Sequence, residues 1–99
     1  MSRPKPTVLL ESHEERRSVN ARVFQVLEAA AVYAVFYDGQ PCNIRIATAY
    51  RDYPGPKYPR VTFMSPGHAH RMARRLNKRF NTTAFTVVRF VDGELDLGD

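Results

Sequence analysis

The chain has 99 residues, of which 43% are hydrophobic and 25% are charged, and its formal net charge at pH 7 is +5. This length allows one domain with a small core and leaves little room for a deep active-site cleft. Cys42 is the only cysteine, which excludes an internal disulfide, and the longest apolar stretch, residues 29–37, is too short to cross a bilayer. Residues 1–7 lack the apolar segment of a secretory signal, so we expect a cytoplasmic protein.

The N-terminal third predicts a short leader followed by an amphipathic helix. Residues 1–7 contain two prolines and are expected to be disordered. Ser12 and Glu15 have the spacing of a capping box, and apolar residues then recur at helical intervals, which predicts a helix over residues 13–29. The alternative is a strand over residues 22–27, because Val-Phe-Gln-Val is also typical of strands.

The middle of the chain predicts a β-hairpin. Residues 31–37 are β-branched or aromatic on both faces, which favours a central strand. Asp38-Gly39 is a strong turn signal, and the alternating residues 44–49 predict a second strand that pairs back antiparallel. Residues 50–59 contain three prolines and a glycine, which predicts a loop.

The last third predicts a strand, a helix and a strand. Residues 60–64 suit a short strand with Val61 and Phe63 facing inward. Ser65-Pro66 predicts the N-cap and first position of a helix that runs to Phe80. Residues 83–91 are apolar on both faces, which favours a final strand in a central position.

These elements predict an α+β fold in the order helix, three strands, helix, strand. We expect a four-stranded, mostly antiparallel sheet with two helices packed on one face. The single domain is predicted to span residues 8–92, between the leader and an acidic tail, residues 93–99. The tail is interpreted as a solubility segment, with the alternative that it folds over the second helix.

Positive charge is concentrated in the second half of the chain. Residues 53–91 contain no Asp or Glu but hold eight Lys or Arg residues. A field of one sign attracts partners of the other, and phosphate backbones are the commonest such partners. The segregation therefore favours a binding function directed at nucleic acid.

The second predicted helix focuses this charge on one side. One arc of its helical wheel carries the apolar residues Ala69, Met72, Ala73, Leu76 and Phe80. The opposite arc carries the cations Arg71, Arg74, Arg75 and Lys78. Two interpretations follow: a solvated helix face with acidic residues of the sheet or tail close by, or a stripe that binds phosphates.

The start of this helix resembles a motif of double-stranded RNA-binding domains. His70-Arg71-Met72-Ala73-Arg74 is similar to the Lys-Lys-x-Ala-Lys start of the second helix in that family. The predicted order of helix, three strands and helix is also similar. The first basic position is His70 here, and a fourth strand follows, so we do not assign the chain to the family.

The proline-rich loop adds a second candidate contact. Its tyrosines Tyr50, Tyr53 and Tyr58 are interleaved with Arg51, Lys57 and Arg60. Rings and cations on one segment can stack bases and hold phosphates, or can form a protein-recognition patch. The alternative is a loop whose tyrosines only cover the sheet edge.

Catalytic and metal sites are not indicated. His68 and His70 would diverge by about 200° on a helix, so they cannot share one metal ion. The basic segment has no carboxylate base and no glycine-rich phosphate loop, and Cys42 and Ser65 have no visible activating partner. We expect no cofactor, no metal and no enzyme activity.

The sequence therefore predicts a small nucleic-acid-binding accessory protein that contacts the phosphate backbone. The predicted contacts are Arg71, Arg74, Arg75 and Lys78 on the helix, and Arg51, Lys57, Tyr58 and Arg60 in the loop. The alternative is a protein-interaction module, an adaptor or inhibitor, that docks on an acidic partner. DNA or RNA, single or double strand, and the oligomeric state are left open by the sequence.

Overall fold

The computed structural model describes residues 6–15, 19–49 and 55–98. The chain divides into two compact units, Met1–Ala30 and Ala31–Asp99, and each is described by itself. Across the described ranges, no helix has the length and apolar character needed to span a membrane. Most of the leader predicted over residues 1–7 lies outside the described residues.

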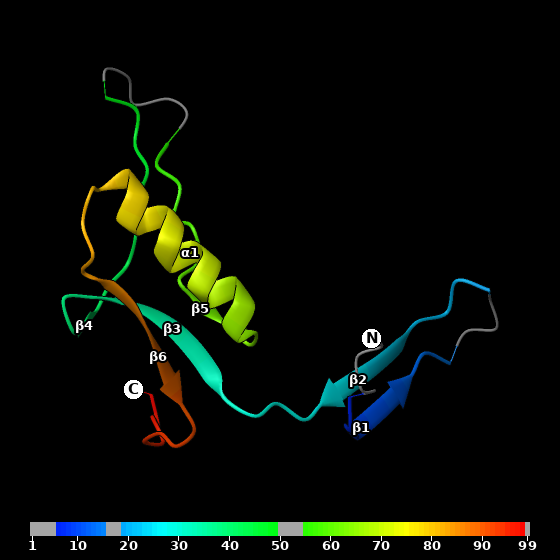
Figure 1. The fold of residues 1–99 in the computed structure, drawn as a ribbon. Helices are drawn as coiled ribbons and strands as arrows, with labels where there is room; N and C mark the ends of the chain where they lie inside the picture. Colours follow the sequence, from blue (N-terminus) through cyan, green and yellow to red (C-terminus); the bar gives the residue numbers. More distant parts are fainter. Residues whose placement is uncertain (1–5, 16–18, 50–54, 99) are drawn as a thin grey trace, which may run out of the picture. The chain divides into compact units, whose positions relative to one another are not determined.

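The first unit contains an antiparallel hairpin, so the prediction of a helix over residues 13–29 is wrong. Strand β1 (Val8–His13) pairs with β2 (Val23–Leu27), so the alternative of a strand over residues 22–27 is confirmed (Figure 1). The valines of this segment fit both a helical interval and strand alternation, and periodicity over so short a run could not separate the two. Their β-branched side chains favour the strand.

The capping box predicted at Ser12 and Glu15 is absent because Ser12 pairs with Phe24 in the hairpin. The neighbouring Glu14 instead makes contacts at the loop end of the hairpin, next to the His13–Val23 pair. Its carboxylate accepts a hydrogen bond from the Arg22 backbone N–H at 3.0 Å and another from Arg22 Nε at 2.7 Å. This charge-assisted pair links the ends of the two strands just beyond their last paired residues.

The hairpin has two different faces. Cross-strand neighbours share a face, and the pairs Leu10–Val26 and Ser12–Phe24 make one face largely apolar. The other face carries Glu11 opposite Gln25, whose side-chain amide donates to the carboxylate at 2.9 Å. This hydrogen bond, with a smaller contribution from His13, lowers the pKa of Glu11.

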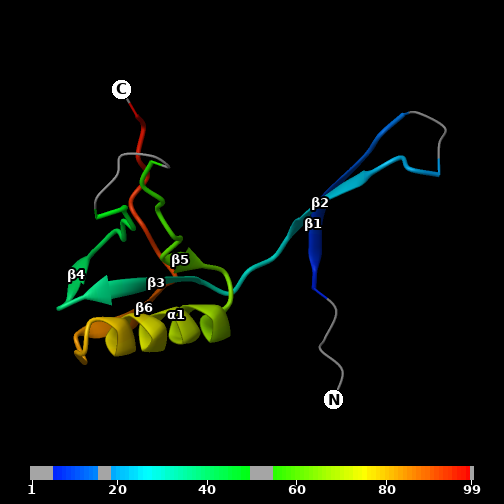
Figure 2. The same ribbon diagram turned by 90° about the horizontal axis from the view of Figure 1, so that it is seen from above.

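The second unit is built around strand β3 (Val32–Tyr37). Strand β6 (Phe85–Phe90) pairs with it along one edge, and the short strands β4 (Gln40–Pro41) and β5 (Thr62–Phe63) share the other edge, all antiparallel. Helix α1 (Pro66–Arg79) covers one face of this sheet (Figure 2). The central position predicted for the strand over residues 31–37, which is β3, is confirmed. The same prediction for β6 is wrong, because β3 is its only partner among the described strands.

The hairpin after β3 is shorter than predicted. Asp38 and Gly39 form the expected turn and both have positive φ, 50° and 75°. The returning strand β4 ends at Pro41, and residues 44–49 contribute only one isolated bridge, to Lys57. Proline lacks the N–H that would extend the ladder, and β5 occupies the rest of that edge of β3.

Helix α1 begins where the sequence predicts. Ser65 holds the N-cap position and Pro66 is the first helical residue, although the Ser65 side chain makes no capping hydrogen bond. The helix ends at Arg79, one residue before the predicted end. Asn81 has φ of 52°, and the N–H of Thr82 donates to the Asn77 carbonyl at 2.9 Å, as in a Schellman motif.

The core lies between α1 and the sheet. Its buried members are Val35, Ala73, Leu76 and Phe85. Partly buried residues packed against them include Val61 and Phe63, which confirms that both face inward. The α+β class and a four-stranded antiparallel sheet are confirmed, but the described residues contain one helix instead of two. The helix-first element order shared with double-stranded RNA-binding domains is therefore absent.

Candidate functional site

Helix α1 turns a row of cations away from the sheet. The row, called here the cationic ridge, consists of Arg71, Arg74, Arg75 and Lys78, and all four are exposed. Ala69, Ala73 and Leu76 on the opposite arc are buried, which fixes this orientation. Phe80, predicted to pack on the sheet, is 58% exposed, although its ring lies 5.6 Å from that of Phe85. The ridge covers about 10 Å along the axis at about 1.5 Å per residue.

No carboxylate neutralises the ridge within residues 6–15, 19–49 and 55–98. The ion pairs found there belong to the hairpin and join Glu14 to Arg22 at 2.7 Å and Glu11 to His13 at 3.6 Å. The described tail carboxylates form no ion pair with α1. The backbone of the C-terminal segment leads away from the helix in Figures 1 and 2. The helix dipole favours the cation of Lys78 in the last turn, but Arg71 and Arg74 lie too far from that end to benefit.

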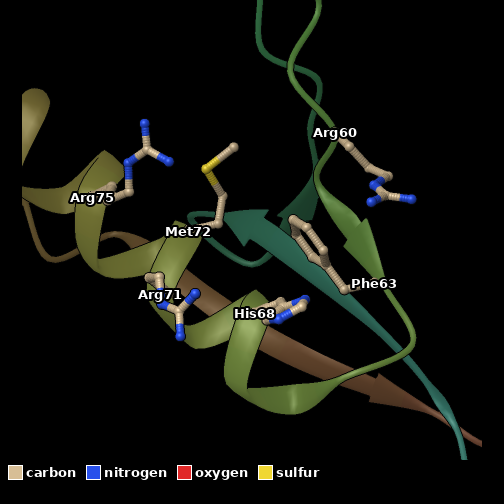
Figure 3. A pocket seen from close by; sticks show the side chains of 6 residues that line it. All are labelled: Arg60, Phe63, His68, Arg71, Met72 and Arg75. Atoms are coloured by element: carbon tan, nitrogen blue, oxygen red, sulfur yellow. The ribbon is translucent and has the colours of Figure 1, made fainter.

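A pocket of about 290 Å³ opens on one flank of the ridge (Figure 3). Its lining residues are Arg60, Phe63, His68, Arg71, Met72 and Arg75. Two ridge members, Arg71 and Arg75, line it from α1, whereas Arg74 and Lys78 do not. The pocket therefore combines three guanidinium groups with an aromatic and a thioether side chain.

The Phe63 ring of β5 contacts Arg60 of the preceding segment and His68 of α1. The guanidinium carbon of Arg60 lies 5.5 Å from the centroid of the Phe63 ring. On α1, the His68 ring meets the Phe63 ring edge-on, with centroids 6.4 Å apart and an angle of 85° between the planes. Pairing of Phe63 with Tyr33 in the sheet holds this group beside the helix.

The loop residues predicted to share ligand binding with the helix do not all lie at the pocket beside it. Arg60 lines the pocket, while Lys57 and Tyr58 do not. The backbone of Lys57 exchanges two hydrogen bonds of 2.8 Å with Ile46, and Tyr58 is 59% exposed. Arg51 lies outside the described residues.

Sequence reasoning missed the pocket. The sequence predicts Phe63 and Met72 in the core and His68 on the basic surface, and no local pattern shows that these three residues converge with three arginines. Their convergence depends on how β5 pairs with β3, which a hydrophobic alternation of five residues does not specify. The spacing of Arg71 and Arg75, one helical turn apart, was the one usable signal.

The groups at the site are suited to binding an anion. Within the part of the chain that the structure describes, no three His, Cys, Asp or Glu side chains gather where they could hold a metal ion. The groups that line the pocket are donors and apolar surfaces, and they suit an anion attached to a planar group. Compared with known proteins, the chain matches no family model, no curated protein and no solved structure.

Proposed function

We propose that this protein binds nucleic acid through the phosphate backbone, with the cationic ridge of α1 as the principal contact. The observation that carries the proposal is the absence of any ion pair between the ridge and a described carboxylate. Each like-charged pair one turn apart on an exposed helix costs a few tenths of a kcal/mol. A polyanion offsets that cost, and release of its condensed counterions supplies affinity.

The pocket extends this contact. Arg60 lies next to the ridge residues Arg71 and Arg75, so two separate parts of the chain present guanidinium groups at one place. Guanidinium groups bind phosphate oxygens through two parallel hydrogen bonds, which is a stronger arrangement than a single ammonium contact. Lys57 and Tyr58 are proposed as a peripheral contact on the neighbouring segment.

Charge reversal at the ridge tests the proposal. The double variant Arg71→Glu/Arg74→Glu should abolish a gel shift of short DNA and RNA strands. The double variant Arg45→Glu/Arg89→Glu is the matched control, because it changes the net charge equally at two exposed arginines outside the ridge. Circular dichroism checks that both variants fold. Equal loss of binding in the two variants would show a general charge effect and would refute a specific role for the ridge.

A protein-interaction module is the second candidate, and the hairpin is the observation that favours it. On its largely apolar face, Leu10 and Phe24 are 67% and 54% exposed. Exposed apolar patches on small proteins often mark protein interfaces, and an acidic partner would also suit the ridge. Capture from a lysate with and without nuclease separates the candidates. Retention of one partner protein after nuclease supports the module, whereas loss of all bound material supports nucleic acid.

A further inference from the structure

The pocket beside the ridge is chemically different from the ridge itself. The ridge presents only cations, whereas the pocket adds the Phe63 ring, the His68 ring and the Met72 thioether between three guanidinium groups (Figure 3). A surface that only followed a duplex backbone would have no use for this apolar floor. The floor therefore points to a ligand with a planar apolar part next to its phosphates.

The planar groups of the pocket are suitable for stacking. The Arg60 guanidinium lies over the Phe63 ring, and Arg60 is an exposed residue. Phe, His and Arg planes are the surfaces on which proteins stack unpaired bases. Met72, partly buried at the helix flank, is a flexible and polarizable wall that adapts to different bases.

The size and position of the pocket limit what can enter. A volume of about 290 Å³ lies just below the range of roughly 300–1,000 Å³ typical of ligand pockets, so the pocket suits one small planar group. Arg71 and Arg75 lie at its edge, while Arg74 and Lys78 continue the positive charge outside it. This continuation favours a strand that runs along α1 over a free nucleotide.

We propose that the pocket holds one unstacked base of a single-stranded nucleic acid, an inference that rests on the proposed function. The base lies against Phe63, His68 and Met72, beside the Arg60 guanidinium. The phosphates next to that base bind Arg71 and Arg75, and the following phosphates bind the rest of the ridge. Bases in a duplex are paired and stacked, and moving one out costs a few kcal/mol, so the protein prefers single strands.

Fluorescence anisotropy with the full chain tests this inference at one salt concentration. The probes are a labelled mixed-sequence single strand, the duplex of the same sequence, the same strand with abasic sites, and an unlabelled mononucleotide as competitor. One stacked base is worth about 1–3 kcal/mol, which corresponds to roughly 5- to 150-fold in affinity. We expect the intact single strand to bind about tenfold more tightly than either the duplex or the abasic strand, and the mononucleotide to compete weakly.

Two pairs of variants localise the effect. Phe63→Leu, which keeps apolar volume in the core, should weaken binding of the intact strand about tenfold, and Phe80→Leu is its control at an aromatic residue outside the pocket. Phe63→Leu should leave binding of the abasic strand unchanged, whereas Arg71→Ala and Arg74→Ala should weaken the intact and abasic strands alike, because an abasic strand keeps its phosphates. Should Phe63→Leu lose its circular dichroism signal, the exposed His68→Ala variant provides the same comparison.

The outcomes separate this inference from the proposed function. Equal affinity for intact strand, abasic strand and duplex would leave nucleic-acid binding in place and overturn the base pocket. Tight competition by the mononucleotide would also overturn it, because the site would then serve a free nucleotide. Absence of binding to every strand at low salt would overturn both.

Discussion

The side-chain amide of Asn77 makes two hydrogen bonds with the backbone of Phe85. Its Oδ1 accepts from the Phe85 N–H at 2.9 Å, and its Nδ2 donates to the Phe85 carbonyl at 3.0 Å. The pair joins the last turn of α1 to the first residue of β6, next to the core. It therefore fixes how α1, and with it the cationic ridge, lies on the sheet.

Asn77→Ala should destabilise the second unit by about 1–3 kcal/mol, because two partly buried backbone groups lose their partner. Urea denaturation followed by circular dichroism measures this change. Asn77→Asp should lower the stability less than Asn77→Ala does. One carboxylate oxygen still accepts from the Phe85 N–H, although the other now faces the Phe85 carbonyl. A stability unchanged by Asn77→Ala would show that packing alone holds the helix.

Arg74→Glu should stabilise the free protein while weakening nucleic-acid binding. Arg74 lies three residues from Arg71 and four from Lys78, so the change replaces two repulsive pairs by two attractive ones. Each repulsive pair that is removed and each attractive pair that is formed contributes about 0.2–0.5 kcal/mol. The expected gain in stability is therefore about 1 kcal/mol at low salt, and it should shrink as the salt concentration rises. Thermal unfolding at two salt concentrations measures it. A loss of stability would mean that Arg74 has a structural partner.

Cys42 should react slowly with alkylating reagents in the folded protein. Burial raises the pKa of its thiol, and its Sγ lies 3.3 Å from the Val35 carbonyl. A raised pKa means that the thiolate fraction at a given pH is lower in the folded protein than in the unfolded chain, so the folded protein reacts more slowly. The ratio of the unfolded to the folded rate should be largest below the unfolded pKa and should fall as pH rises through that value. Iodoacetamide labelling with and without urea, read by mass spectrometry, gives the comparison. Equal rates would contradict the buried environment.

The parts of the fold that the sequence predicts correctly are those with local signals. Ser65-Pro66 marks the start of α1, and Asp38-Gly39 marks the turn, because each depends on a backbone property of its own residues. The cationic ridge is also predictable from local sequence, because helical spacing alone places Arg71 and Arg74 on the side opposite the buried arc.

The predictions that are wrong concern elements whose structure depends on pairing between distant segments. Residues 22–27 carry valines whose spacing fits a helix, and only their pairing with β1 makes them a strand. The strand expected over residues 44–49 is excluded by β5, which lies later in the chain and takes the same edge of β3. The pocket has the same origin, because Phe63 reaches His68 only through that pairing.

The salt dependence of affinity tests the central role of the ridge most directly. The measurement is the dissociation constant for a short nucleic-acid strand over a series of salt concentrations, for the wild type and for a variant with alanine at all four ridge positions. At roughly 0.7–0.9 per phosphate, the four ridge contacts should contribute about −3 to −4 to the slope of log affinity against log salt for the wild type. The slope of the variant should be shallower by that amount and keep only the contribution of cations outside the ridge, such as Arg60 and Lys57. An equally steep slope in the variant would contradict the assignment of phosphate binding to the cationic ridge.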